Sequence, residues 1–281
     1  MGLLKKGMQG SLALLFLFCG VLTAQEKAQE DSQEESQQEE FKPVYLTVST
    51  FHWNDDPDID FSEWLDTEKE YFEKVTSKND LIIGSGFYMH YFTPDNSEII
   101  QVSVYENWAD IEKANEKNQE LIEAAWPDEE KRRSFFQKQN SYYSPQHSDE
   151  IYTSMRFHKP MEMASEEPLV YYVKSSELSM NGEGSPASFG EYNKNVVQKN
   201  KFVKAYYTHR HLWGANSREM AEVFVFEDLA DLEASFEEDE RLVGEHWPDE
   251  GERESFMEDM GKLFTGRHSD YIYRNVPELM K

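Results

Sequence analysis

Two histidines, His90 and His211, are the residues of this sequence best suited to chemistry. They lie 121 positions apart, each near the end of a stretch rich in β-forming residues. A histidine held among aromatic rings can act as a general base or as a metal ligand. We therefore predict that both are catalytic. Because side chains alternate along a strand, the residues that share their face are predicted ligand contacts. These are Tyr88, Phe92, His209 and Trp213.

Two other interpretations of these histidines remain open. Each could be hydrogen-bonded within a packed interior, as most buried polar side chains are. His209 and His211 could instead present two imidazoles side by side to a divalent metal, with His268 and Asp270 as further ligands. Tyr88 lies 121 positions before His209, so the segment that contains His90 has no second histidine there. Such a metal site would therefore exist once in the chain.

The segments His147-Ser148-Asp149 and His268-Ser269-Asp270 contain the residue types of a hydrolase triad. Adjacent residues do not form the line of nucleophile, base and orienting acid, which is assembled from distant positions. We predict that each segment is a shaped turn from a helix into a strand. His147 and His268 are further candidate ligand contacts.

These histidines belong to an internal repeat. Trp126-Pro127-Asp128-Glu129 returns as Trp247-Pro248-Asp249-Glu250, again with an offset of 121. His90 and His211, and the two His-Ser-Asp segments, follow the same offset. Because no insertion separates the copies, we expect two versions of one structural unit.

Each copy is predicted to have the element order β-α-β-β-α-β. Alternating and helical patterns, with turn residues between them, define the elements. In the first copy we expect strands over 44–51, 81–92, 99–105 and 150–157, a helix over 61–75, and a helix over 108–142 that proline 127 breaks. In the second copy we expect strands over 169–175, 202–213, 219–226 and 271–275, a helix over 188–198, and a helix over 229–264 that proline 248 breaks.

This order is the split β-α-β arrangement of ferredoxin-like domains, in which both helices cover one face of a four-stranded sheet. Two tandem copies can cover the bare faces by packing sheet to sheet. Over roughly residues 43–275, the chain resembles the dimeric α/β-barrel superfamily as a fused pseudo-dimer of class α+β, with the barrel pairing within one chain. The superfamily includes antibiotic-biosynthesis-type monooxygenases, haem-degrading enzymes and stress-responsive barrels, and fold alone does not choose among them.

The domain prediction divides the chain into five segments. Residues 1–24 are a signal peptide, 25–41 a disordered acidic spacer, 42–158 the first repeat, 159–167 a linker and 168–281 the second repeat. Residues 1–24 carry a positive end and a short apolar core, as export signals do. We expect cleavage after Ala24 and a secreted or periplasmic protein. Lipoprotein processing at Cys19 is less favoured, because bulky Phe18 precedes it.

Composition narrows the range of partners. The 281 residues carry a formal net charge of −27. Such a charge repels phosphate backbones and anionic lipid, so we expect neither nucleic acid nor, after signal cleavage, a membrane as partner. Cys19 is the single cysteine, so the mature chain should have no thiol chemistry and no disulfide.

The sequence thus indicates an exported small-molecule-binding protein or small enzyme with a barrel pocket lined by histidine and aromatic rings. By the resemblance, such an enzyme would be a cofactor-light monooxygenase or an isomerase with histidine as base. The alternatives are a haem- or metal-binding protein, neither cofactor being favoured, and a non-catalytic exported interaction module.

Overall fold

The structure is a computed structural model that describes residues 41–54, 60–163 and 165–281. The predicted signal peptide and nearly all of the acidic spacer lie outside these residues. Pro43–Lys281 forms one compact unit that contains both repeats. Within the described residues, no helix is long and apolar enough to cross a membrane.

The element order β-α-β-β-α-β occurs twice, as predicted. The first repeat contains β1 (Tyr45–His52), α2 (Phe61–Lys74), β2 (Gly84–Phe92), β3 (Glu98–Tyr105), α3 (Trp108–Ala125), α4 (Glu129–Ser141) and β4 (Ser148–Lys159). The second contains β5 (Val170–Leu178), α5 (Pro186–Tyr192), β6 (Ala205–Trp213), β7 (Glu219–Phe226), α6 (Leu229–His246), α7 (Glu250–Gly261) and β8 (Phe264–Asn275).

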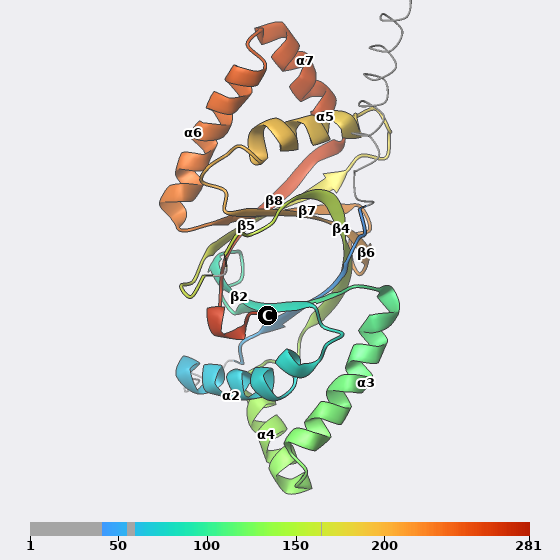
Figure 1. Ribbon diagram of the computed structural model, residues 1–281, viewed down its shortest axis with the longest axis vertical. Helices are drawn as coiled ribbons and strands as arrows, with labels where there is room; N and C mark the ends of the chain where they lie inside the picture. Colours follow the sequence, from blue (N-terminus) through green and yellow to red (C-terminus); the bar gives the residue numbers. More distant parts are fainter. Residues whose placement is uncertain (1–40, 55–59, 164) are drawn as a thin grey trace, which may run out of the picture. The chain divides into compact units, whose positions relative to one another are not determined.

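The eight strands form one closed antiparallel barrel, in the order β1-β3-β2-β8-β5-β7-β6-β4, with β4 pairing back to β1. Each repeat contributes four consecutive strands. The two sheets join at both edges, where β2 pairs with β8 and β4 with β6. The barrel is therefore the predicted pseudo-dimer, and it leaves no open sheet edge among these strands. Figure 1 shows the closed ring of strands between two groups of helices.

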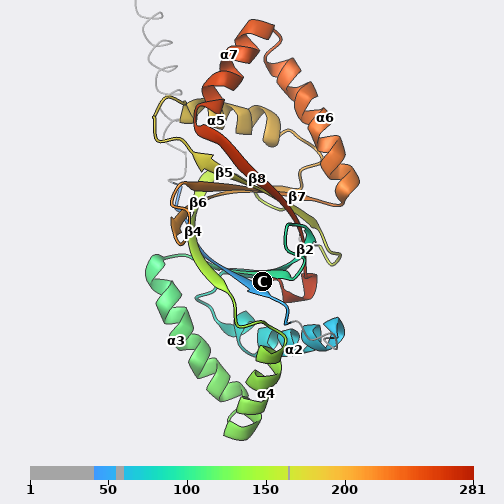
Figure 2. The same ribbon diagram turned by 180° about the vertical axis from the view of Figure 1, so that it is seen from behind.

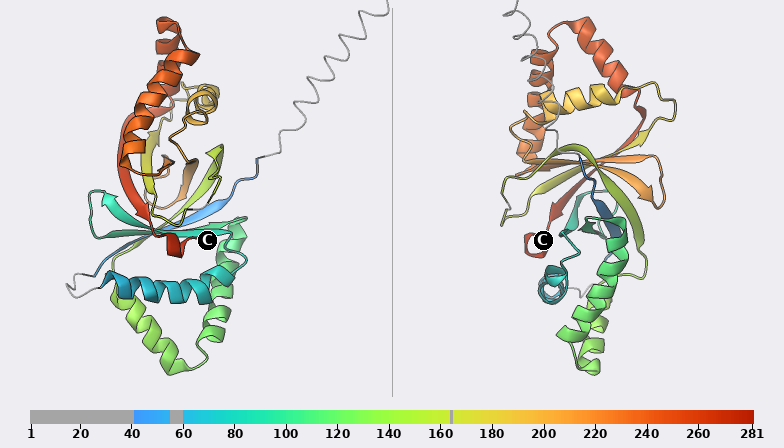
Figure 3. Two further views of the ribbon diagram at one scale, coloured as in Figure 1. Left: turned by 60° about the vertical axis from the view of Figure 1, so that its left-hand side comes forward. Right: turned by 45° about the vertical axis from the view of Figure 1, so that its right-hand side comes forward.

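The helices of each repeat cover only the outer face of that repeat's own sheet. Helices α2, α3 and α4 lie on one side of the ring, and α5, α6 and α7 lie on the opposite side (Figures 2 and 3). The barrel interior is filled by side chains of both repeats: Tyr88 and Ile100 of the first repeat pack against a cluster of the second that includes Leu169, Tyr171 and Tyr273. Apolar surface of both sheets is therefore buried in one shared interior.

Several predicted boundaries differ from the structure. Strand β8 begins at Phe264 instead of residue 271, with Gly266 in a left-handed conformation (φ 82°) near its start. His268-Ser269-Asp270 therefore lies inside a strand, and β4 begins at Ser148, so neither segment is the predicted turn. The helix predicted over 188–198 is present, as an α-helix over Pro186–Tyr192 that continues as a π-helix over Asn193–Val197.

The repeated Trp-Pro-Asp motif builds the kink between the paired helices. Asp128 caps α4 by accepting a hydrogen bond from the Lys131 nitrogen, while the Trp126 ring stacks on Phe135 with centroids 4.2 Å apart. The Trp126 carbonyl accepts a bond from Arg132 Nη1. Asp249, Trp247, Phe256 and Arg253 repeat each of these contacts. The motif is therefore structural, and the predicted helix break at the proline is confirmed.

A buried asparagine in each repeat joins the loop before the second strand to the helix after the third strand. Asn79 is fully buried and donates to the Ala114 carbonyl, while its own carbonyl accepts from the Leu81 nitrogen. Asn200 makes the equivalent bonds with Ser235 and Phe202. Each amide thus satisfies one buried main-chain acceptor and one partly buried main-chain donor.

We expect Asn79→Ala and Asn200→Ala each to lower the free energy of unfolding by about 2–3 kcal/mol, because each leaves buried main-chain groups unpaired. Urea denaturation measures the change. Asn140→Ala, at an exposed position of α4, is the control and should change stability little. A loss below about 0.5 kcal/mol at both buried positions would contradict this role.

Candidate functional site

His90 and His211 both point toward the barrel interior, at the ends of β2 and β6. Alternation along β6 places Tyr207, His209 and His211 on the face of the interior residue Ala205. Tyr88 belongs to the same interior cluster from β2, and His90 follows it by two residues. The predicted shared face is therefore present as far as the two histidines.

The outermost residues of that face behave differently. Strand pairing between β2 and β8 shifts register between His90 and Phe92, which breaks the alternation. Phe92 is consequently 56% exposed, and Trp213 at the end of β6 is 71% exposed. The prediction that Phe92 shares the face of His90 was wrong, because an irregularity in strand pairing is not visible in a side-chain pattern.

A tyrosine and a glutamate link the two repeats beside each histidine. Tyr152 in β4 donates to Glu219 at the start of β7, with an oxygen–oxygen distance of 3.2 Å. Tyr273 in β8 donates to Glu98 at the start of β3, at 3.0 Å. Both tyrosines and both glutamates are related by the offset of 121. The interior therefore holds two related sets of Tyr, Glu and His, each built from both repeats.

We define the His211 site as Glu150, Tyr152, His211, Gly214 and Glu219. The His211 side chain is only 1% exposed, and neither ring nitrogen has a hydrogen-bond partner. Its ring packs edge-on against Tyr152, with centroids 5.1 Å apart. Glu150 Oε1 lies 3.8 Å from Nε2, which is too long for a hydrogen bond. Two buried polar atoms are thus left unsatisfied, and such groups in a folded protein call for an explanation.

Two carboxylates share one phenolic hydrogen in this site. Tyr152 Oη lies 2.8 Å from Glu150 Oε2 and 3.2 Å from Glu219 Oε1. A phenol donates one hydrogen, so it cannot satisfy both carboxylates at once. Burial, followed by the charges of Glu219 and Glu150, raises the pKa of Tyr152, which therefore remains a protonated donor. The other oxygen of Glu150 accepts from the Ala215 nitrogen at 3.2 Å.

Gly214 closes the site from the β6–β7 turn. It has φ 134°, which side chains rarely adopt. A Cβ at this position would also lie 2.8 Å from His211 Nε2 and 2.8 Å from Glu150 Cγ. Any other residue would press on both groups, so the close approach of the turn to the histidine requires glycine.

The residues around His90 differ from those around His211 at two positions, Thr93 and Tyr271. We define the His90 site as His90, Thr93, Glu98, Tyr271 and Tyr273. Thr93 occupies the position of Gly214, and its Oγ1 lies 2.7 Å from His90 Nδ1. Thr93 donates its hydroxyl hydrogen to the Asp95 carbonyl, so it accepts from Nδ1–H. Tyr271 stands where Glu150 stands. This site has one carboxylate fewer and a bonded histidine.

His209 lies deeper in the barrel. Its ring is nearly parallel to that of Tyr207, with centroids 6.5 Å apart, and its Nδ1 is buried without a partner. Burial lowers the pKa of His209 to about 4, so the ring is neutral near pH 7. Within residues 41–54, 60–163 and 165–281, no three His, Cys, Asp or Glu side chains gather as a metal-binding group.

The other two predicted histidines are on the surface. His147 and His268 are each 51% exposed, and each pairs with the aspartate two positions on, at 3.2 and 2.8 Å. Asp149 also accepts from Ser49, and Asp270 from Tyr172. The structure does not bring His147 or His268 to the His211 site.

Two surface pockets, of about 190 and 450 Å³, are lined by neither His90 nor His211.

Haem fits poorly at His211. Gly214 and Glu150 lie directly against Nε2, in the space that a macrocycle bound to this nitrogen would occupy. We therefore derive no step through haem.

Sequence reasoning missed Glu150, Tyr152, Gly214 and Glu219. The offset could have found the glutamate and tyrosine, because Glu98–Glu219 and Tyr152–Tyr273 are identical between the copies. It could not have shown that each pair is formed between repeats. Gly214 opposite Thr93 was visible as an asymmetry, but its meaning needs the turn geometry.

No protein-family model matches the chain, and no curated protein is similar to it in sequence. Among solved structures, a "Putative monooxygenase" from Fusobacterium nucleatum has a TM-score of 0.52 at 10% identity, covering 84% of this chain and 94% of that one. A mutant chlorite dismutase from Candidatus Nitrospira defluvii has a TM-score of 0.50 at 13% identity, covering 88% and 96%. The chain has the dimeric α/β-barrel fold, with ferredoxin-like repeats, that these proteins share.

His209 should make the fold sensitive to acid. Its pKa is about 4 when folded, against an ordinary value of 6.5, so the unfolded chain binds more protons between these values. Stability therefore falls as pH drops from 6.5 to 4, by at most roughly 3 kcal/mol from this residue. Urea denaturation of His209→Phe and the parent chain across pH 4–7 should show a weaker pH dependence in the variant. Parallel curves would contradict the assignment.

Proposed function

We propose that the chain is an exported protein that binds a small organic molecule at the His211 site, with His211 as the proton acceptor. One observation carries this proposal. Both nitrogens of a histidine that is only 1% exposed lack partners, beside two carboxylates that share one hydrogen. Leaving a buried polar group unpaired costs about 1–3 kcal/mol. A ligand that bonds to these atoms would remove that cost.

The chemistry of the site specifies the kind of ligand. Glu150, Glu219 and one ring nitrogen of His211 would supply acceptors, whereas Tyr152, the Ala215 nitrogen and the other ring nitrogen of His211 would supply donors. Acceptors exceed donors, so the complementary molecule carries O–H or N–H groups. Phenols, enols and amines meet this requirement, and the Tyr152 ring offers an apolar surface beside them.

Catalysis would begin with a proton transfer. An O–H or C–H proton of the ligand would move to a nitrogen of His211, and the adjacent Glu150 carboxylate would stabilise the resulting imidazolium. Tyr152, held protonated by its raised pKa, would act as a donor toward developing negative charge. Both an isomerase and a cofactor-light monooxygenase can start in this way. The monooxygenase name of the Fusobacterium nucleatum neighbour supports the second reaction by fold analogy alone.

The entry path follows from exposure. Glu150 is 23% exposed, while His211 is closed in behind it. The Gly214–Ala215 turn holds Glu150 through the bond from the Ala215 nitrogen. A ligand that takes over this carboxylate would displace the turn and reach the imidazole from that side.

An interaction module is a second candidate, and the exposed aromatic residues favour it. Phe92 and Trp213 occupy equivalent positions in the two repeats, and both lie near hairpin ends with most of their surface in solvent. Large aromatic side chains are common anchors of protein interfaces. This role and the ligand site are compatible in one chain.

Catechol, which carries two adjacent hydroxyls, tests the proposal against its dimethyl ether, veratrole, which has none. Long-range ¹H–¹⁵N spectra of the histidine rings, recorded on the mature chain, report which imidazole the probe reaches. We expect catechol to shift the His211 nitrogens saturably and veratrole to leave them unchanged, because only catechol can donate to unpaired acceptors.

Two matched variants complete this experiment. His211→Leu should raise the Kd for catechol at least tenfold, whereas His90→Leu should change it less than twofold. Equal shifts at both histidines, equal binding of veratrole, or an unchanged Kd in the His211 variant would refute the proposal.

A further inference from the structure

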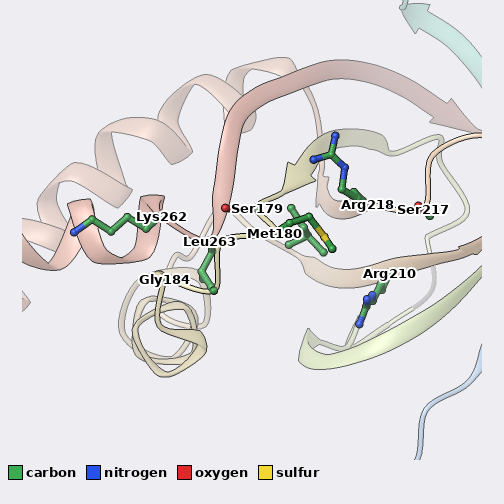
Figure 4. A pocket seen from close by; sticks show the side chains of 10 residues that line it. Ser179, Met180, Gly184, Arg210, Ser217, Arg218, Lys262 and Leu263 are labelled. Atoms are coloured by element: carbon green, nitrogen blue, oxygen red, sulfur yellow. The ribbon is translucent and has the colours of Figure 1, made fainter.

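A pocket of about 190 Å³ lies on the outer side of the β6–β7 hairpin. It is bordered by the loop after β5, by the end of β6 and the residues just before β7, and by the residues after α7. Its lining consists of Leu178, Ser179, Met180, Gly182, Gly184, Arg210, Ser217, Arg218, Lys262 and Leu263. Figure 4 shows the arginines of the hairpin and Met180 of the loop around this space.

Main-chain contacts hold the walls of the pocket together. The Ser179 nitrogen donates to the Leu263 carbonyl, and the Leu178 nitrogen donates to the Arg218 carbonyl, both at 2.8 Å. Gly184 packs so closely on the Leu263 main chain that a Cβ would overlap it. The loop is therefore fixed to both α7 and the hairpin, and two wall carbonyls are already used as acceptors.

The pocket gathers positive charge on a strongly acidic chain. Arg210, Arg218 and Lys262 line it, although the formal net charge of the chain is −27. Lys262 pairs with Glu258 at 3.2 Å, and Arg218 pairs with Glu177. Arg210 makes no ion pair with any carboxylate of the described residues.

The acidic neighbour does not cancel this charge. Glu177 Oε1 is engaged by Arg218, and Oε2 accepts from Thr265 Oγ1 at 3.1 Å. Arg267 Nη1 lies 3.9 Å from the same carboxylate. One carboxylate thus faces Arg218 and Arg267, while a guanidinium keeps further N–H donors after one ion pair.

The first repeat lacks this arrangement. Met89, Ser97 and Ser141 stand at the positions of Arg210, Arg218 and Lys262. Met89 packs against the hydrophobic core beneath α2, where Arg210 faces solvent. The cationic pocket therefore belongs to the second repeat alone, and the first repeat supplies the matched neutral residues.

We propose that this pocket binds a small amphipathic carboxylate. The carboxylate would bond to the guanidinium groups of Arg210 and Arg218, which suit planar oxyanions. A short apolar body would lie on Leu178, Met180 and Leu263. The volume is below the 300–1,000 Å³ of pockets for drug-sized ligands, so the ligand is the size of a single ring.

This site is separate from the His211 site but shares its strands. Arg210 and His211 are consecutive in β6 and point to opposite faces, as do Arg218 and Glu219 at the start of β7. The carboxylate would sit outside the barrel wall and the donor ligand inside it. A substitution that abolishes binding at one site should therefore leave binding at the other site intact.

Benzoate is the probe, and neutral benzyl alcohol is its match in size. Isothermal titration calorimetry of the mature chain at low salt should show saturable 1:1 binding of benzoate and at least tenfold weaker binding of benzyl alcohol, because only benzoate carries the charge. Arg210→Met combined with Arg218→Ser, the residues of the first repeat, should raise the Kd for benzoate at least tenfold.

Two controls make the outcome decisive. Arg133→Ser removes an exposed arginine of α4 and should change the Kd less than twofold. His211→Leu should also leave it within twofold. The proposal is overturned if benzoate does not saturate, if benzyl alcohol binds equally well, if the double variant keeps its affinity, or if His211→Leu abolishes binding.

Discussion

A four-stranded sheet with helices on one face has an apolar face that water must not reach, and this constraint governs the whole molecule. Each repeat meets it by turning that face toward the other repeat. The edges then pair as well, β2 with β8 and β4 with β6, so that eight strands close into one ring. Closure removes exposed strand edges and places the side chains of both repeats in one interior.

Closure also explains why the histidine sites contain residues of both repeats. Tyr152 meets Glu219, and Tyr273 meets Glu98, only because each last strand lies beside the other repeat's sheet. A duplicated chain starts with two equal sites, and one can keep the stable arrangement while the other changes. Thr93 satisfies His90, whereas Gly214 leaves His211 unpaired and lets Glu150 approach it. The His211 site, whose imidazole lacks hydrogen-bond partners, is therefore the one suited to bind a ligand.

The repeat offset and the turn chemistry allowed most of the fold to be predicted. The offset of 121 and the element order were enough to predict the barrel. Proline 127 was enough to predict the break in the helix. The start of β8 was missed because Gly266 and the polar residues after it resemble a loop, while pairing with β5 holds them as a strand. Tertiary pairing overrides local propensity at such positions.

The candidate site was only half predictable. Alternation correctly turned His90 and His211 inward, since a strand has a fixed period of two. It failed at Phe92, where a register shift intervenes. The repeated His-Ser-Asp segments suggested His147 and His268 as ligand contacts, but both are exposed and pair with aspartates. Glu219 could have been found through its identity with Glu98, but its bond with Tyr152 forms only when the barrel closes, and Glu150 has no identical counterpart at Tyr271.

The central claim is that the unpaired nitrogens of His211 serve a ligand and not the fold. The free energies of unfolding of His211→Leu and His90→Leu, measured side by side in urea without ligand, test it most directly. His211→Leu should be as stable as the parent chain or more so, because it removes unsatisfied polar atoms, while His90→Leu should lose about 1 kcal/mol with its bond to Thr93. A loss of about 2 kcal/mol or more in His211→Leu would show that the imidazole is a structural group with partners of its own.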